Sequence, residues 1–150
     1  MKLEAMLDQS GVEYEKHLHG TTYTAQGLAA EEHVSGYMVA KPVIVMHRND
    51  PIMCVIPAPK RVDLNRVADV LGVPEVYLAT ESDMAELFPD CELGAEPPIG
   101  SLFGMRTVMD RGLIEDEYLI MQAGTHRDAI KVRRSDWERL SDPLVGEITR

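Results

Sequence analysis

A run of glycines and prolines between two apolar segments is the first stretch of this sequence that could do chemistry. It reads Cys-Glu-Leu-Gly-Ala-Glu-Pro-Pro-Ile-Gly-Ser-Leu-Phe-Gly over residues 91–104. Gly94 and Gly100 accept backbone angles that other residues resist, whereas Pro97 and Pro98 fix φ and supply no N–H donor. The stretch is either an ordinary surface turn or a shaped wall whose N–H groups face a small polar ligand. Residue types alone leave both interpretations open.

A lysine interrupts the most apolar part of the chain. Residues 37–46 read Tyr-Met-Val-Ala-Lys-Pro-Val-Ile-Val-Met, with Lys41 in the middle. An ammonium group in a buried strand costs free energy unless it reaches water or a partner. Either the head of Lys41 lies at a sheet edge, or the strand delivers a cation into a pocket, where desolvation alters its pKa. Pro42 removes a ladder donor and favours a bulge or a strand end.

Other reactive residue types give weaker signals. His17 and His19 would share one face of a strand, which is a possible spacing for metal ligands, but no third ligand is nearby. We therefore expect no metal site. The sequence has no G-x-G-x-x-G after a strand, no Walker loop and no G-x-S-x-G elbow, so side-chain nucleophilic catalysis is not indicated.

Length and composition place the chain among soluble globular proteins. A chain of 150 residues with 45% hydrophobic and 27% charged residues predicts one domain spanning 1–150. Two cysteines, Cys54 and Cys91, favour a reducing compartment over a disulfide framework. The N-terminus carries acidic residues unlike a signal peptide, and no apolar run approaches membrane-spanning length. We expect a cytoplasmic protein with no membrane partner.

The net charge limits the possible nucleic-acid partners. A formal charge of −10 opposes tight nonspecific binding to DNA or RNA, since phosphate neutralisation supplies most of that affinity. A local basic patch could still contact one end of a nucleic acid. Residues 131–134, preceded by Arg127, are the densest basic stretch, and Lys60 with Arg61 is a second. Such stretches are more often solvated strand or turn faces than binding sites.

Periodicity and capping signals predict the elements that position these residues. The first expected helices cover residues 3–10 and a segment from Thr24 to Gly36. A third covers 64–71, between an Asp63 cap and Gly72, and a helical turn runs from Ser82 or Asp83 to Leu87. A last helix is expected from a Ser135–Glu138 capping box. The expected strands cover 12–18, a hairpin of 37–46 and 52–56 with its turn at 49–51, then 76–79, 106–109, 118–121 and 129–132. Residues from Asp142 onward are predicted to be a tail. These elements predict a mixed α/β (α+β) single domain, with a central, largely antiparallel mixed sheet surrounded by short helices.

Three features occur in an ordered set that resembles a known family. They are Lys41 in its apolar strand, the loop from Gly94 to Gly100, and His126 after Gly124. The chain resembles the YbaK/EbsC family, the aminoacyl-tRNA deacylase domain that is also inserted in bacterial prolyl-tRNA synthetases. The resemblance covers about residues 22–140 and includes the stretch 57–63, the Cys-x-x-Gly approach at 91–94 and the strand end at 108–110. It implies the fold of the prolyl-tRNA synthetase-associated domain.

The resemblance also implies an activity. Family members hydrolyse the ester of mischarged tRNA in trans, with a small amino acid such as alanine or cysteine on proline tRNA as the expected substrate. Lys41 would contact the charged 3′ end, Gly94 to Pro98 would line the aminoacyl pocket, and His126 would shape that pocket. The family needs no metal and no covalent nucleophile, and we expect no cofactor. Pro42 departs from the small polar residue that commonly follows the family lysine.

These arguments define a predicted site and its alternatives. The predicted catalytic residues are Lys41, Gly94, Pro98 and Gly100, and the predicted substrate-binding residues are His126, Tyr23, Ala95 and Pro97. Loop N–H groups would hold the ester carbonyl or the attacking water. The alternatives are a non-catalytic module that binds a small amino-acid-like ligand or a synthetase, and an interaction protein with a vestigial pocket. The expected partners are the 3′ end of mischarged tRNA and an aminoacyl-tRNA synthetase, with the protein a monomer or a homodimer.

Overall fold

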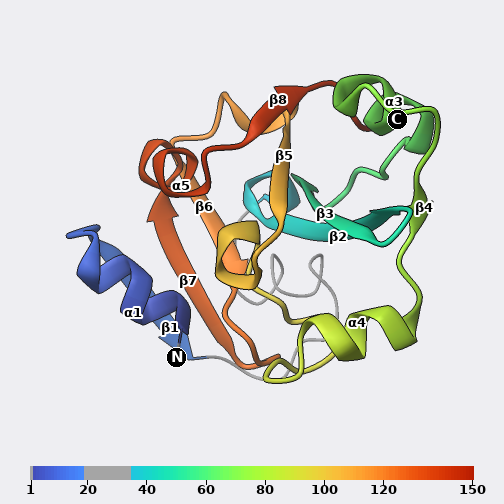
Figure 1. The fold of residues 1–150 in the computed structure, drawn as a ribbon. Helices are drawn as coiled ribbons and strands as arrows, with labels where there is room; N and C mark the ends of the chain where they lie inside the picture. The colour runs from blue at the N-terminus through green and yellow to red at the C-terminus, as the bar shows by residue number, and fades with distance from the viewer. Residues whose placement is uncertain (1, 19–34) are drawn as a thin grey trace.

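The computed structural model describes residues 2–18 and 35–150 (Figure 1). The predicted helix from Thr24, together with His19 and Tyr23, lies outside the described residues. Two sheets and several short helices make up the rest of the fold, as the mixed α/β prediction required. None of the described helices has both the length and the apolar character needed to cross a membrane.

The larger sheet has five strands in the order β4-β2-β3-β5-β8. Its members are β2 (Ala40–His47), β3 (Asp50–Pro57), β4 (Tyr77–Leu78), β5 (Arg106–Asp110) and β8 (Leu144–Gly146). The hairpin of β2 and β3 is antiparallel, whereas β5 and β8 join it in parallel. The hairpin turn was predicted at 49–51, but Asp50 and Pro51 already belong to β3, and Asp50 pairs with His47. Arg48, with φ 55°, makes the turn with Asn49.

The smaller sheet is antiparallel, with the order β1-β7-β6. Its strands are β1 (Tyr14–Leu18), β6 (Tyr118–Gln122) and β7 (Asp128–Arg133). A single parallel bridge between Val39 and Ile120 connects this sheet to the start of β2. The predicted central sheet is therefore divided in two, and β2 and β6 lie side by side where the two sheets meet (Figure 1).

Local capping explains where the helices begin and end. The described α-helices are α1 (Lys2–Gln9), α3 (Leu64–Leu71), α4 (Glu81–Leu87) and α5 (Arg134–Ser141), and the 3-10 turns are Gly36–Met38, Gly100–Phe103 and Arg111–Leu113. Helix α3 has the predicted bounds, because Asp63 accepts hydrogen bonds from two N–H groups and Gly72 ends it at φ 71°. Helix α4 starts earlier than predicted, since Thr80 and Asp83 form a reciprocal capping box.

The predicted capping box of the last helix is wrong. The residue before α5 is Arg133, and no side chain caps the helix. Glu138 instead accepts a hydrogen bond from Nη1 of Arg134 at 2.8 Å, one turn earlier on the same helix face. Trp137, on the same helix, is fully buried and anchors it to the core.

Successive side chains of β3 point to opposite faces of the sheet and pack into two different parts of the core. Met53 and Val55 pack with α1, α5 and the smaller sheet, whereas Ile52, Cys54 and Ile56 face α3. This is the expected consequence of a side-chain period of two. Residues of both faces are fully buried, so β3 lies at the centre of the molecule.

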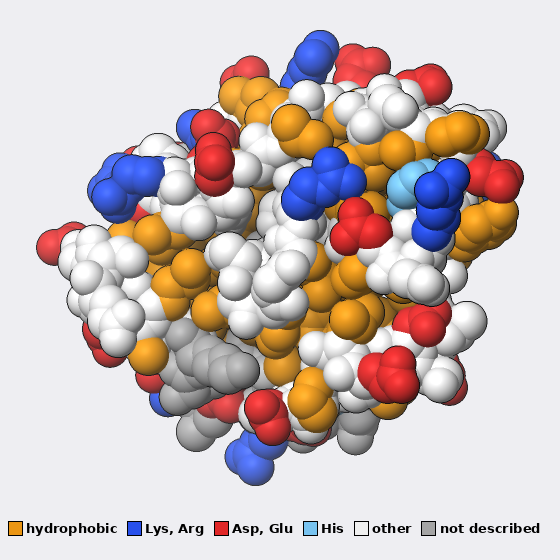
Figure 2. Space-filling model, viewed as in Figure 1, with side chains coloured by type: hydrophobic (Ala, Val, Ile, Leu, Met, Phe, Trp, Pro, Cys, Tyr) orange, Lys and Arg blue, Asp and Glu red, His pale blue; other side chains and the backbone are white. Residues whose placement is uncertain are grey.

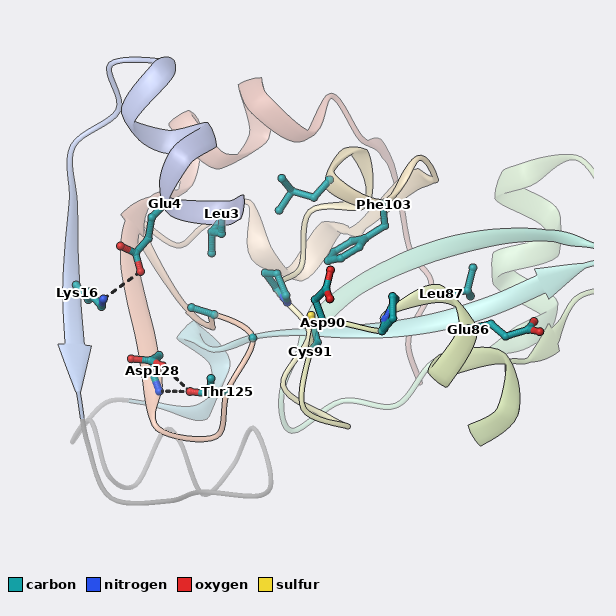
Figure 3. A pocket seen from close by; sticks show the side chains of 15 residues that line it. Leu3, Glu4, Lys16, Glu86, Leu87, Asp90, Cys91, Phe103, Thr125 and Asp128 are labelled. Carbon is teal, nitrogen blue, oxygen red and sulfur yellow. Dashed lines mark hydrogen bonds and ion pairs between the residues drawn. The ribbon is translucent and has the colours of Figure 1, made fainter. Parts of the chain in front are cut away.

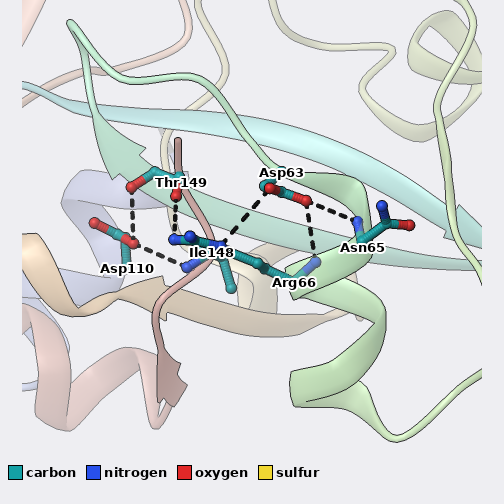
Figure 4. Close-up of polar contacts among 6 residues, drawn as sticks. All are labelled: Asp63, Asn65, Arg66, Asp110, Ile148 and Thr149. Carbon is teal, nitrogen blue, oxygen red and sulfur yellow. Dashed lines mark hydrogen bonds and ion pairs between the residues drawn. The ribbon is translucent and has the colours of Figure 1, made fainter.

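The C-terminal residues are part of the core and not the predicted tail (Figure 4). After β8, Ile148 is fully buried against the α3 face. Asp110 accepts hydrogen bonds from Ile148 N–H at 3.1 Å and from the Thr149 hydroxyl at 3.3 Å. The carbonyl of Ile148 accepts from Asp63 N–H at 2.7 Å, and Arg66 donates to the Thr149 carbonyl at 2.9 Å. The segment therefore completes one edge of the larger sheet.

Candidate functional site

Strand β2 holds Lys41 at the junction of the two sheets. The side chain is half-buried, and its Nζ donates a hydrogen bond to the carbonyl of Lys60 at 3.1 Å. Burial lowers the pKa of Lys41 below its ordinary value, and the positive charge of Arg61 lowers it further. Lys41 therefore presents a partly desolvated ammonium group, as expected for a cation held in a pocket.

Pro42 does not break the strand. Strand β2 runs without interruption from Ala40, and Pro42 pairs with Val55 in the β2–β3 ladder. On the side of β2 away from β3, β4 pairs with Val45 and Met46 alone among the described strand residues. The part of β2 that contains Lys41 and Pro42 therefore has no β4 partner. A proline is tolerated at such an unpaired edge because no neighbour requires its N–H.

The middle of the glycine–proline loop is buried and is not an ordinary surface turn. Every residue from Ala95 to Gly100 is buried. The indole N–H of Trp137 donates to the Pro98 carbonyl at 2.9 Å, and Gly100 N–H donates to the Thr107 hydroxyl at 3.1 Å. A Cβ at position 100 would lie 2.5 Å from that hydroxyl oxygen, so only glycine fits there. The core therefore fixes the shape of this loop.

Most N–H groups of the loop already have acceptors within the protein. Gly94 N–H donates to Oε1 of Glu96 at 3.1 Å, and Ile99 N–H donates to the Pro97 carbonyl at 2.9 Å. Gly94 and Gly100, both predicted to offer N–H groups, are thus engaged by Glu96 and Thr107. Between Gly94 and Gly100, the backbone N–H of Glu96 is the one that has no acceptor among the described residues. It is the N–H group that a ligand could use.

A cavity of about 600 Å³ brings Lys41 and the loop together. We call it the Lys41 cavity. It is bounded by the first half of β2, the start of α4, the loop and the end of β6, and its polar lining residues are Lys41, Glu81, Gly94, Glu96 and Gln122. The remaining lining is mainly apolar, with the exposed side chains of Leu78 and Leu93 at its margin. An apolar cavity with a few convergent polar groups is the usual form of a small-ligand site.

The other predicted site residues lie elsewhere in the described structure. Ala95, Pro98 and Gly100 are buried in the loop and contribute no described lining to the Lys41 cavity. His126 is 5% exposed, and its Nε2 lies 2.7 Å from the Leu93 carbonyl oxygen, so it supports the loop at its outer end.

A larger cavity, of about 860 Å³, lies on the other side of the loop (Figure 3). Pro97 lines it, and α1, β1 and the start of β7 contribute the opposite wall. Lys16, the one lysine in its described lining, is paired with Glu4 at 3.2 Å. Its carboxylates are Glu4, Glu86, Asp90 and Asp128. Four carboxylates beside one lysine oppose an anionic ligand more strongly than the two carboxylates, Glu81 and Glu96, that line the Lys41 cavity. We therefore favour the smaller Lys41 cavity despite the difference in volume.

No metal centre is seen in the described part of the chain. His17 contacts Oε2 of Glu15 at 3.2 Å, and the other histidine of the predicted pair, His19, lies outside the described residues. Within residues 2–18 and 35–150, no three histidine, cysteine or acidic side chains are grouped closely enough to hold a metal ion.

The sequence-based prediction missed two polar residues of the Lys41 cavity. Glu96 stands within the quoted loop but was given no role, and Gln122 directly follows the predicted strand 118–121. A carboxamide at the end of an apolar strand, two residues before a glycine, is a signal that could have identified Gln122. Burial of Glu96 could not be inferred, because it depends on contacts between the loop and residues far away in the sequence.

Comparison with known structures supports the fold. A crystal structure of the hypothetical protein APE2540 matches with a TM-score of 0.90 at 22% identity, covering 100% of both chains. A candidate trans-editing enzyme for prolyl-tRNA synthetase matches with a TM-score of 0.85 at 18% identity, covering 99% of this chain and 95% of that one. A candidate signal-transduction protein from Marinobacter aquaeolei VT8 matches with a TM-score of 0.79 at 13% identity, but this chain spans only 30% of its length.

Comparison with protein families identifies the chain more directly. No curated protein sequence matches it. Residues 19–140, which include Lys41, the whole loop and His126, match the aminoacyl-tRNA editing domain. The match covers most of the chain and agrees with the resemblance inferred from those residues. The protein therefore belongs to the aminoacyl-tRNA editing domain family, which includes YbaK.

Proposed function

We propose that this protein is an aminoacyl-tRNA deacylase that acts in trans on mischarged tRNA. Its substrate would be the ester of a small amino acid, such as alanine or cysteine, on proline tRNA. The observation that carries the proposal is the shared cavity: a half-buried lysine and two loop residues, Gly94 and Glu96, line the same 600 Å³ space. A structural neighbour described as a candidate trans-editing enzyme for prolyl-tRNA synthetase supports the choice of tRNA.

The lining residues suit ester hydrolysis without a covalent intermediate. Water attacks the ester carbonyl carbon, negative charge develops on the carbonyl oxygen, and the tetrahedral adduct expels the ribose oxygen of the tRNA, which takes up a proton. The Lys41 ammonium and the Glu96 N–H are among the donors available to the developing oxyanion. One well-placed donor typically contributes about 3–4 kcal/mol to such a transition state.

The cations near Lys41 suit the phosphate of a terminal nucleotide. Lys60 follows β3, and its carbonyl holds the Lys41 ammonium, while the charge of Arg61 is close enough to lower the Lys41 pKa. Among the described residues, the other cavity offers one lysine, Lys16, which is already paired with Glu4. We therefore place the 3′ end of the tRNA at the Lys41 cavity, with the amino acid inside it.

A deacylation assay with matched lysine variants tests this proposal. Proline tRNA charged with alanine, cysteine or serine is incubated with the wild type, Lys41→Ala and Lys16→Ala, and loss of the ester is measured. We expect the wild type to hydrolyse at least one substrate, Lys41→Ala to lose about a hundredfold or more in rate, and Lys16→Ala to keep the wild-type rate. The two lysines line different cavities, so the pair identifies which cavity acts.

Three results would contradict the proposal in different ways. No hydrolysis of any substrate above the buffer rate would overturn the activity and leave a binding module. Loss of activity in Lys16→Ala but not in Lys41→Ala would move the site to the larger cavity. Full activity in both variants would remove both lysines from the reaction.

A further inference from the structure

Gln122, in the wall of the Lys41 cavity, carries a buried amide group with no partner. The residue is 6% exposed, and neither its Oε1 nor its Nε2 has a hydrogen-bond partner among the described residues. A buried amide that forms no hydrogen bond destabilises a fold, and an apolar side chain of the same shape would avoid that cost. A ligand in the cavity would supply the missing partner.

Gln122 and Lys41 both follow the bridge that joins the two sheets. The parallel bridge joins Val39 to Ile120, and Lys41 and Gln122 each lie two residues further along their strands. Residues two apart on a strand face the same side, so the ammonium and the amide are directed to the same side of the junction. Both side chains line the same cavity.

Backbone hydrogen bonds bring Glu96 to the same wall. Gly124 N–H donates to the Ala95 carbonyl at 2.8 Å, and the Gly124 carbonyl accepts from Glu92 N–H at 2.8 Å. These two hydrogen bonds join the loop to the residues that follow β6. Gln122 is the last residue of β6, and Glu96 follows Ala95 in the loop. The Glu96 carboxylate accepts from Gly94 N–H through Oε1 only, so it retains further acceptor capacity.

This arrangement complements an aminoacyl ester that has a free amino group. Such an ester carries an α-ammonium group on the carbon next to its carbonyl. The ammonium needs hydrogen-bond acceptors, whereas the carbonyl oxygen needs donors. The Gln122 oxygen and the Glu96 carboxylate are acceptors, whereas Lys41 attracts the carbonyl oxygen and repels the ammonium. We propose that Gln122 recognises the α-amino group of the bound aminoacyl ester, so that the cavity selects free aminoacyl esters over N-acylated ones.

The proposal rests on the proposed function but can be tested without turnover. The probes are 3′-deoxy-3′-(alanylamino)adenosine, whose amide bond resists hydrolysis, and its N-acetyl derivative. Calorimetric titration of the wild type, Gln122→Met, Gln122→Glu and Gln9→Met compares the two dissociation constants. Gln9 is an exposed glutamine on α1 and serves as the matched control.

We expect the wild type and Gln9→Met to bind the free-amino probe about tenfold to a hundredfold more tightly than the acetylated one, because hydrogen bonds to charged groups are the stronger ones. Gln122→Met should lose this preference, and Gln122→Glu should keep it because an acceptor remains. The melting temperature of Gln122→Met should equal or exceed that of the wild type, since the variant removes a partnerless amide.

Each contrary result overturns the inference. An unchanged preference in Gln122→Met would show that the amide does not contact the amino group. Equal binding of both probes by the wild type, or binding of neither, would remove the proposed selectivity. A lowered melting temperature of Gln122→Met would assign the amide a structural partner. A protein that binds the free-amino probe selectively but hydrolyses no tRNA ester would refute the deacylase and retain the recognition role.

Discussion

At the scale of single residues, the Lys41 cavity contains groups that fit poorly in a core but fit well in a reaction site. Lys41 is a half-buried cation whose pKa is lowered by burial, and Gln122 is a buried amide without a partner. Each costs stability in the empty protein and gains a partner when an ester with a free amino group enters. Stability and activity should therefore change in opposite directions when either is replaced by an apolar residue.

Replacing Lys41 by methionine tests this trade-off. We expect Lys41→Met to be more stable than the wild type and inactive in deacylation. Because the folded-state pKa of Lys41 is lowered, the unfolded chain binds more protons between that pKa and the ordinary lysine value, and wild-type stability rises with pH across this interval. The stability gain of Lys41→Met should therefore be largest at lower pH and shrink as the pH rises through the folded-state pKa.

Thermal melts of both proteins from neutral to alkaline pH check this prediction. Lys16→Met, at the exposed ion pair with Glu4, is the control and should show little difference at any pH. A Lys41→Met variant that is less stable than the wild type at neutral pH would contradict it. That result would mean that the bond from Nζ to the Lys60 carbonyl outweighs the desolvation of the ammonium.

At the scale of elements, the predictable parts were those defined by neighbours in the sequence. Asp63 and Gly72 enclose α3 because a cap acts within one turn. The burial of the glycine–proline loop was not predictable, because it depends on Trp137 and Thr107. The positions of Glu96 and Gln122 were not predictable either, because the loop is joined to the end of β6 by hydrogen bonds of Gly124 to Glu92 and Ala95, which are far from it in the sequence.

The prediction of a C-terminal tail was wrong for a related reason, and the role of the segment can be tested. Strand β8 pairs with β5, far away in sequence, and Ile148 fills a fully buried position next to α3. We expect Ile148→Ala to lower the free energy of unfolding by about 2–5 kcal/mol, the usual cost of a deleted core side chain. Val145→Ala, at a position that is 42% exposed, should change it by only about 0.5 kcal/mol or less.

Urea denaturation of the two variants provides the measurement. If Ile148→Ala and Val145→Ala were equally mild, the last residues would be a tail after all. A large loss in Ile148→Ala alone would also place the Asp110 hydrogen bonds to Ile148 and Thr149 within the cooperative unit.

At the scale of the whole molecule, the net charge of −10 must be reconciled with a tRNA substrate. On the face shown in Figure 2, the Lys and Arg side chains are interspersed with Asp and Glu and with apolar areas. No broad basic surface is visible in that view. A protein of this kind gains little from long contact with a polyanion. We therefore expect it to engage only the end of the tRNA, through the few cations near the Lys41 cavity.

The salt dependence of deacylation measures how many phosphates are contacted. Each phosphate neutralised on a single strand contributes about 0.7 to the slope of the logarithm of affinity against the logarithm of salt concentration. We infer that Lys60 and Arg61 each contact a phosphate. The double variant Lys60→Ala/Arg61→Ala should then reduce the magnitude of the slope of log kcat/KM against log salt concentration by about 1.4. The control pair Lys131→Ala/Arg133→Ala lies on β7 and contacts Tyr118 there, so its slope should equal that of the wild type. A reduced slope in the control pair alone would instead place the tRNA along the smaller sheet, away from the Lys41 cavity.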